Sequence, residues 1–165
     1  IAAAGFDGIY LDRCDVFEEI EEHHPKIAAE RRDLNADMVA FIAELSRWVR
    51  REHPGFGIIM QNAEGLLETK AVRGAIDAIA KEELLFGLDK VEKRNSNEDV
   101  KEARNALDLM RRDGKAVFVV EYLDKAELRL EATGALRAAG FVPYMARKDR
   151  ELATLEADQP QAAIA

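Results

Sequence analysis

Short stretches of alternating or continuous apolar residues recur along the chain and predict strands. In the first stretch, Ile9 and Leu11 alternate with Tyr10 and Asp12, so a period of two would send the two pairs to opposite faces of a strand. The five predicted strands are residues 8–12, 57–61, 77–81, 116–121 and 141–145.

Helical periodicity predicts helices in most of the gaps between these strands. Residues 36–52 place apolar side chains along one face, with Asn35 as the expected N-cap. Residues 97–112 repeat this pattern behind Ser96 or Asn97, which are both good N-cap residues. An alternation of strand and helix of this kind predicts parallel βαβ units.

A third long helix is bounded by a start signal and a stop signal. Asp124 followed by Glu127 is typical of a helix N-terminus, and Gly140 marks the C-terminus before the last strand. A shorter helix is predicted in the acidic run of residues 15–22, whose carboxylates would form a solvent-exposed face.

Composition places the chain among ordinary globular proteins. Its 165 residues suit one domain, and 48% hydrophobic with 34% charged residues is a common mix. No apolar run approaches the roughly 20 residues that a membrane-spanning helix needs. The formal net charge of −8 argues against binding of nucleic acid and is compatible with a cationic ligand. The single cysteine, Cys14, excludes an internal disulfide and a cysteine-based zinc site.

The two ends of the chain suggest a piece of a longer protein. The chain begins at Ile1 without a methionine or a leader, and it reaches its first predicted strand almost at once. We expect residues 1–156 to belong to one domain and residues 157–165 to form a flexible tail.

Polar side chains gather at the carboxyl ends of the predicted strands. In a parallel (β/α) barrel these ends build the active site, so acids in this position predict chemistry. Alternation puts each terminal acid on the face of the residues two and four positions before it. If these faces point into a barrel, Asp12, Glu82 and Glu121 converge. The polar strand ends are Asp12, Gln61 with Asn62, Glu82 with Glu83, and Glu121.

Five sequence segments together establish a family resemblance. In chain order, "GFDGIYLDRCDVFE", "IIMQNAEGLL", "AIAKEELLFG", "VFVVEYLD" and "GFVPYMARKD" resemble the endo-alpha-1,4-polygalactosaminidase family of glycoside hydrolases (family 114) and its bacterial and archaeal relatives. The resemblance runs from Gly5 to about Leu155. It implies an α/β fold of the (β/α)8 TIM-barrel type, of which this chain would hold strands four to eight.

The resemblance assigns the two catalytic roles. It implies that Asp12 is the nucleophile and Glu82 the acid/base. A glycosidic bond needs such a pair, because one carboxylic acid protonates the leaving oxygen and one carboxylate meets the oxocarbenium-like centre. Apolar walls or the charge of Glu83 would hold Glu82 protonated, while Asp12 stays ionised. A nucleophilic aspartate implies retention of the anomeric configuration.

Further side chains are predicted to contact the substrate. The resemblance assigns such a role to Asn62 and to Glu121 with Tyr122. An amide can hold a sugar hydroxyl, a tyrosine offers its flat face to a pyranose ring, and nearby acids line the cleft. The predicted substrate contacts are Tyr10, Asp15, Asn62, Glu83, Glu121, Tyr122 and Tyr144.

Several alternatives stay open on the sequence alone. A strand-end aspartate such as Asp12 can simply cap a turn, and Glu83 rather than Glu82 can be the acid. Asp12, Asp15 and Glu82 can instead bind magnesium through oxygen ligands in a barrel enzyme. A barrel that binds sugar without cleaving it is a further alternative.

The resemblance implies a secreted, cell-surface or periplasmic hydrolase that cuts within alpha-1,4-linked galactosamine, a cationic polysaccharide, without a cofactor or a metal. Neither nucleic acid nor a membrane is an expected partner. A segment of five barrel strands has two open edges and an apolar inner face. We therefore expect the missing first half of the barrel, or a second copy of the chain, to cover them.

Overall fold

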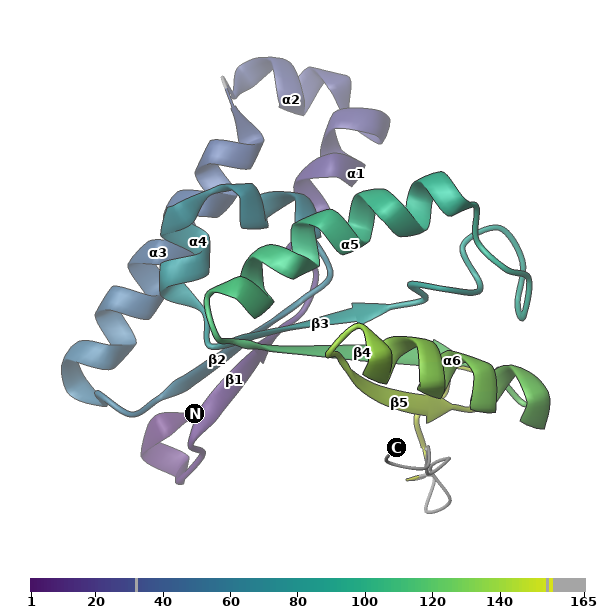
Figure 1. Ribbon diagram of the computed structural model, residues 1–165. Coiled ribbons are helices and arrows are strands. Elements are labelled where there is room, and N and C mark those ends of the chain that lie inside the picture. The colour runs from purple at the N-terminus through teal and green to yellow at the C-terminus, as the bar shows by residue number, and fades with distance from the viewer. Residues whose placement is uncertain (32, 154, 156–165) are drawn as a thin grey trace. The chain divides into compact units, whose positions relative to one another are not determined.

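Strands and helices alternate along the whole described part of the chain (Figure 1). The structure is a computed structural model that describes residues 1–31, 33–153 and 155. It divides into two compact units, Ile1–Ile79 and Ala80–Ala165. The tail predicted at residues 157–165 lies outside the described residues.

Within its described residues, the first unit contains two parallel strands and six helical elements. Strands β1 (Gly8–Leu11) and β2 (Gly57–Gln61) pair with Leu11 opposite Met60. The helical elements are η1 (Ala2–Ala4), α1 (Val16–His23), α2 (Pro25–Glu30), α3 (Leu34–Glu52), η2 (Glu64–Glu68) and α4 (Lys70–Ala75).

The second unit continues the alternation. Strand β3 (Ala78–Glu82) crosses the division between the units, and β4 (Ala116–Tyr122) pairs in parallel with β5 (Val142–Ala146). Helix α5 (Asn97–Arg112) precedes β4 along the chain, and α6 (Ala126–Ala138) connects β4 to β5. All five predicted strands are confirmed, and their ends differ from the predicted ones by no more than one residue.

The strand order distinguishes between two kinds of α/β fold. The five strands follow one another as β1-β2-β3-β4-β5. A doubly wound fold reverses its strand order at a switch point, whereas a (β/α) barrel adds each strand beside the previous one. The observed order therefore confirms an α/β fold of the barrel type.

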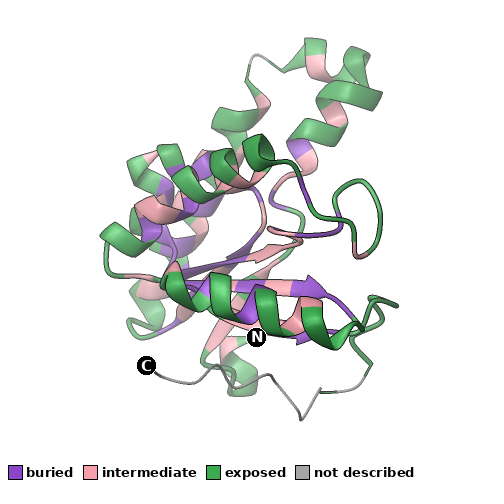
Figure 2. Cartoon of the chain, turned by 45° about the vertical axis from the view of Figure 1, so that its right-hand side comes forward, coloured by how far each residue is buried: buried purple, intermediate pink, exposed green. Residues whose placement is uncertain are grey.

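Helices cover one face of the β4–β5 pair. Val119 and Glu121 on β4 are fully buried, and so is Met145, which lies opposite Glu121 on β5. Helix α6 contacts both strands and α5 contacts β4, and Figure 2 shows the strands buried beneath helices whose outer sides are exposed. On the other face, Val120 and its partner Tyr144 are only half-buried. This unit is thus built like a segment of a barrel wall.

The first unit shows a similar difference between the two faces of its strands. Met60 is fully buried, whereas Tyr10, on the opposite face, is 54% exposed. Gly8 lies so close to Gly57 that a Cβ on Gly8 would be 2.7 Å from the Gly57 carbonyl oxygen. The glycine just ahead of the first strand's apolar residues therefore permits the two strands to pair closely.

Helix α3 begins two residues earlier than predicted. The predicted N-cap, Asn35, is wrong, because Asp33 caps the helix by accepting the N–H of Ala36 at 2.9 Å. Aspartate is as good a cap as asparagine, and its charge also suits a helix N-terminus. For α5, the predicted cap Ser96 is confirmed, since its hydroxyl accepts the N–H of Asp99.

The start of α6 also differs from the prediction. Lys125 rather than Asp124 is the N-cap residue, and its side chain makes no capping bond. The Asp124 carboxylate instead accepts the N–H of Lys148 at 3.2 Å, beyond the end of β5. The sequence pattern predicts that the Asp124 carboxylate caps α6, but in the structure this carboxylate binds the backbone beyond β5 instead. The predicted stop is confirmed, because Gly140 follows the helix with a φ of 79°.

Candidate active site

The carboxyl ends of β3 and β4 are joined by a hydrogen bond between two predicted site residues. Glu82 is the last residue of β3, Tyr122 is the last residue of β4, and the Tyr122 hydroxyl donates to Oε1 of Glu82. Burial and this hydrogen bond raise the pKa of Tyr122. The hydroxyl therefore keeps its proton and orients the carboxylate at the end of the sheet where a barrel carries its active site.

A second acidic residue beside this pair is engaged in an ion pair. The Glu83 carboxylate binds the guanidinium of Arg150, which follows β5. The same guanidinium lies 5.8 Å from the centre of the Tyr122 ring, within cation–π range. Glu82 thus faces a neutral hydroxyl and Glu83 faces a cation. Arg150 was not among the predicted site residues, because no local sequence pattern indicates that an arginine beyond the last strand pairs with Glu83.

The prediction that Glu121 converges with Glu82 is wrong. Tyr122 is the β4 residue that meets Glu82, and consecutive strand residues point to opposite faces. Glu121 is fully buried on the helix-covered face, where its carboxylate accepts the N–H of Leu85 at 2.7 Å and that of Phe86 at 3.2 Å. Apolar residues occupy both faces of β4. The alternation of residues therefore shows which side chains share a face, but it does not show which face points into a barrel. The buried position gives Glu121 a structural role.

The buried carboxyl of Glu121 is expected to make stability depend on pH. Burial raises the pKa of Glu121 from its ordinary 4.5 to about 8, although the N–H groups of Leu85 and Phe86 oppose the shift; the charge of Glu83 adds to it. The folded protein therefore holds this proton more tightly than the unfolded chain does. The group's contribution to the free energy of unfolding is present below about pH 4.5 and is lost as the pH rises to about 8.

Urea unfolding at about pH 5 and about pH 8 measures this contribution. Glutamine does not titrate, so the midpoint should fall less between the two pH values in Glu121→Gln than in the unmodified protein. An equal fall in both proteins would contradict the predicted pH dependence.

In the first unit, Asp12 directly follows β1, and its side chain is exposed. One of its oxygens accepts the N–H of Arg13 at 2.8 Å, and the Arg13 guanidinium pairs with Glu19 of α1. Asp15 is the N-cap of α1 but makes no side-chain capping bond. The hydrogen bond to Arg13 is the kind of contact that the turn-capping alternative for Asp12 predicts. The Asp12 carboxylate is nevertheless exposed at the surface.

Cys14 lies between these two aspartates in the sequence and is buried. Burial raises the pKa of the Cys14 thiol to about 11, and the charges of Asp15 and Asp12 add to the shift. The thiol therefore stays protonated at neutral pH and is not a nucleophile. Both carboxylates lie close enough to act on it, which places them in one small region after β1.

Three tyrosines among the predicted substrate contacts, Tyr10, Tyr122 and Tyr144, lie on the less covered faces of their strands. In the first unit, the hydroxyl of Tyr10 donates to Gln61, the last residue of β2, and Asn62 follows directly. In the second unit, Tyr144 lies opposite Val120 and so shares its face with Tyr122.

The backbone takes a left-handed conformation just after three successive strands. The angle φ is 59° at Arg13 after β1, 52° at Asn62 after β2 and 55° at Glu83 after β3. For non-glycine residues this conformation costs about 1–3 kcal/mol, and it persists where the surroundings fix it, often at functional sites. In each unit by itself, the left-handed residue is a predicted site residue or the neighbour of one: Arg13 follows Asp12, and Asn62 and Glu83 are themselves predicted substrate contacts.

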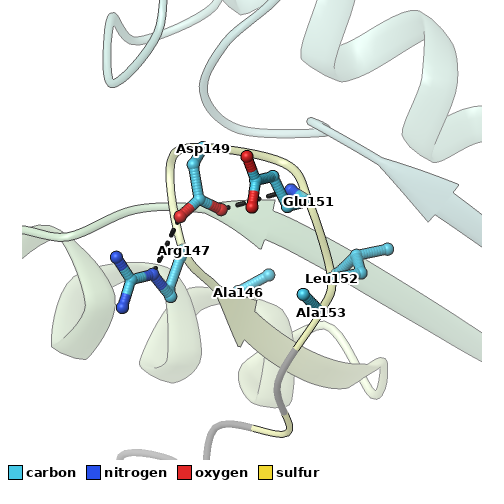
Figure 3. A pocket seen from close by; sticks show the side chains of 6 residues that line it. All are labelled: Ala146, Arg147, Asp149, Glu151, Leu152 and Ala153. Atoms are coloured by element: carbon cyan, nitrogen blue, oxygen red, sulfur yellow. Dashed lines mark hydrogen bonds and ion pairs between the residues drawn. The ribbon is translucent and has the colours of Figure 1, made fainter.

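A small pocket lies beyond the end of β5 (Figure 3). Its volume is about 210 Å³, and within it the Asp149 carboxylate pairs with Arg147 at 2.9 Å and accepts the N–H of Glu151. None of the predicted site residues lines it, so we assign no substrate to this pocket. The lining residues are Ala146, Arg147, Asp149, Glu151, Leu152 and Ala153.

Within residues 1–31, 33–153 and 155, no three histidine, cysteine, aspartate or glutamate side chains come together as a metal site requires. In the same part of the chain, no helix is both long and apolar enough to cross a lipid bilayer.

Barrel-type strand order with carboxylates and tyrosines at the carboxyl ends of the strands is the arrangement of a (β/α)-barrel enzyme. Comparison with known proteins identifies the family. Residues 1–161 match the glycoside-hydrolase family GH114, and the chain belongs to that family.

Relatives of the chain occur in bacteria and archaea. An uncharacterized protein of Deinococcus radiodurans is 31% identical over 97% of this chain and 48% of its own length. An uncharacterized protein of Methanocaldococcus jannaschii is 34% identical over 92% of this chain and 45% of its own length. The chain therefore spans about half the length of these relatives.

A solved structure shares the fold. The glycoside hydrolase domain of PelA from Pseudomonas aeruginosa matches with a TM-score of 0.63 and 20% sequence identity, over 88% of this chain and 55% of that domain. At this level of identity the match shows the fold alone. It agrees with the interpretation of the chain as part of a TIM-type barrel.

Proposed function

We propose that this chain is part of a retaining glycoside hydrolase that cleaves internally within alpha-1,4-linked, galactosamine-rich polysaccharide. The observation that carries the proposal is Glu82, held at the end of β3 by the Tyr122 hydroxyl, in a chain of family GH114. The substrate, its linkage and a location outside the cytoplasm rest on the family resemblance of the sequence segments.

In the proposed reaction, Glu82 gives its proton to the glycosidic oxygen while an oxygen of Asp12 attacks the anomeric carbon. The bond between that carbon and the leaving oxygen breaks, and a glycosyl ester forms on Asp12. The ionised Glu82 then takes a proton from water, whose oxygen attacks the same carbon and releases Asp12. Each attack inverts the configuration, so the two together retain it.

The predicted substrate contacts keep different roles in this proposal. The rings of Tyr10, Tyr122 and Tyr144 offer flat faces to sugar rings, and the Asn62 amide holds a hydroxyl. Asp15 contributes negative charge, whereas Glu83 is already paired with Arg150. Because Glu121 is fully buried, we do not include it among the substrate contacts.

The product lengths formed from galactosamine oligomers test the proposal. Internal cleavage gives products of intermediate length at early times, as mass spectrometry would show. Oligomers that stay intact would overturn the hydrolase. Binding without shortening would favour the alternative of a barrel that binds sugar without cleaving it.

A preference for cationic oligomers is expected from the acidic charge of the chain. The net charge is −8, and Glu21 and Glu22 lie exposed on α1, shortly after Asp12. Deacetylated galactosamine oligomers should therefore be cleaved with a kcat/KM about tenfold higher than acetylated ones at low salt. The advantage should shrink at high salt, because salt screens exposed charges. Equal turnover of both oligomers, unaffected by salt, would contradict this expectation.

A matched pair of variants tests whether the position of the charge matters. Glu21→Gln with Glu22→Gln should reduce the preference for deacetylated oligomers. Glu98→Gln with Glu102→Gln, on the exposed side of α5, makes the same change in net charge and should reduce it less. Equal effects would attribute the preference to overall charge.

We also propose that the remaining strands and helices of the same barrel cover the open side of the first unit. β1 is an edge strand, Phe41 and Trp48 on α3 are 54% and 59% exposed, and the relatives are about twice as long. The 165-residue chain alone should therefore self-associate, as sedimentation would show. Emission of Trp48, the single tryptophan, should shift to shorter wavelength as the chain associates.

Serine substitutions identify the surface that associates. Phe41→Ser and Trp48→Ser should weaken self-association, whereas Leu130→Ser, at an equally exposed position on α6, should leave it unchanged. A compact monomer of the unmodified chain would refute the proposed cover.

A further inference from the structure

The backbone that follows Glu82 is held by a carboxyl group in the core. Glu121 is fully buried, and each of its oxygens accepts one backbone N–H, from Leu85 and from Phe86. A buried carboxyl group is costly unless hydrogen bonds compensate it. Here it supplies acceptors to the N–H groups of Leu85 and Phe86.

Asn95 holds the same segment from a second position. Its side chain is 93% buried, as its exposed fraction of 7% shows. The amide nitrogen donates to the carbonyl oxygens of Glu83 at 2.7 Å and Leu84 at 3.0 Å, and the amide oxygen accepts the N–H of Leu88 at 3.0 Å. Both ends of the amide are therefore used to fix the backbone on the two sides of the segment that Glu121 binds.

The segment closes on itself as a tight hairpin. Phe86 and Arg94 form an antiparallel bridge, and the N–H of Gly87 donates to the carbonyl of Lys93 at 2.9 Å. Gly87 has a φ of 108°, which favours glycine, and a Cβ on this residue would meet the side chain of Glu83. The left-handed backbone of Glu83 is consistent with this tight fixation.

We infer that Glu121 and Asn95 are positioning residues for the Glu82–Glu83 pair. They fix the backbone directly after Glu82, and this fixation holds the Glu82 carboxylate against the Tyr122 hydroxyl and the Glu83 carboxylate against Arg150. Neither residue touches the substrate. The inference rests on the proposed function as far as catalysis is concerned, while the fixation of the backbone stands independently of it.

A matched control exists at the other end of the same loop. Glu92 also accepts two backbone N–H groups, those of Asp124 at 2.9 Å and Lys125 at 3.0 Å. Glu92→Gln and Glu121→Gln are therefore the same chemical change on the same kind of contact. Of these two glutamates, only Glu121 binds the segment that follows the proposed acid, at Leu85 and Phe86.

The kinetic test compares these two variants on galactosamine oligomers. Glu121→Gln should lower kcat by about 10- to 100-fold, because small displacements of a catalytic group are this costly, with KM changed by less than about twofold. Glu92→Gln should stay within about threefold of the unmodified protein in both parameters. An equal loss of kcat in the two variants would overturn the inference.

Hydrogen exchange tests the fixation without using activity. In the unmodified protein, the amides of Leu85, Phe86 and Leu88 should exchange slowly. Glu121→Gln should speed up exchange at Leu85 and Phe86. Unchanged exchange at these two amides would overturn the inference even if the variant were inactive. A protein without hydrolase activity would refute the proposed function and leave this result to decide the fixation.

Asn95→Asp provides a second variant in case Glu121→Gln does not fold. Aspartate keeps the shape of asparagine but places a carboxylate oxygen against the carbonyls of Glu83 and Leu84. Exchange at Leu88 should stay slow or change little, because an acceptor oxygen remains for its N–H, whereas kcat should fall with KM retained. Wild-type kcat in Asn95→Asp would overturn the role of Asn95.

Discussion

Replacing Asp12 with asparagine is expected to lower kcat on galactosamine oligomers by about 10³-fold or more, because an amide cannot form the glycosyl ester. The substitution is nearly isosteric, and Asp12 is exposed and makes one hydrogen bond, to the N–H of Arg13. The fold should therefore be unaffected, and the loss should lie in chemistry rather than in stability. The measurement is steady-state turnover combined with a urea unfolding curve of the variant.

A matched control for this substitution lies at the other end of the same strand. Asp7 immediately precedes β1 and is exposed, so Asp7→Asn makes the same change where a barrel carries stability instead of catalysis. It should leave kcat within about threefold of the unmodified value. Substantial activity in Asp12→Asn would remove Asp12 from the mechanism and leave it as a residue that caps a turn.

The second large effect concerns the acid. Glu82→Gln should lower turnover of galactosamine oligomers by about 10²- to 10⁴-fold, since the leaving oxygen then receives no proton. Substrates with an activated leaving group, such as a nitrophenol, need no such proton and should retain most of the rate of glycosyl-ester formation. This difference between substrates distinguishes a missing acid from a misfolded protein.

Glu83→Gln decides between the two neighbouring glutamates. Its carboxylate is paired with Arg150, so the variant loses an ion pair but keeps the Tyr122–Glu82 hydrogen bond. We expect a smaller loss of activity that is equal on both kinds of substrate. If Glu82→Gln behaves like the unmodified protein while Glu83→Gln is inactive, the acid is Glu83.

The strands could be predicted from the sequence because strand and helix periods are local properties. The stretch from Ile9 to Asp12 and the polar strand ends at Gln61, Glu82 and Glu121 needed no tertiary information. Helix caps were less predictable, since several polar residues compete for each role. Asp33 and Asn35 are both suitable caps, and only the fold determines which of them is used.

The site was predictable in part for the same reason. Alternation placed Glu82 at the end of β3, but it did not tell which face of β4 points toward it, so Glu121 was expected where Tyr122 lies. Arg150 and Asn95 reach their partners across long sequence separations. Asn95 stands in a polar stretch, where a buried amide has no local signal.

The measurement that tests the central claim most directly is the configuration of the first product. Hydrolysis of an alpha-1,4-linked galactosamine oligomer can be followed by NMR as new reducing ends form. The Asp12 and Glu82 mechanism predicts that these ends appear first as the alpha anomer and change to the equilibrium mixture only later. New ends that appear first as the beta anomer would exclude Asp12 as nucleophile, and a spectrum without new reducing ends would contradict the hydrolase itself.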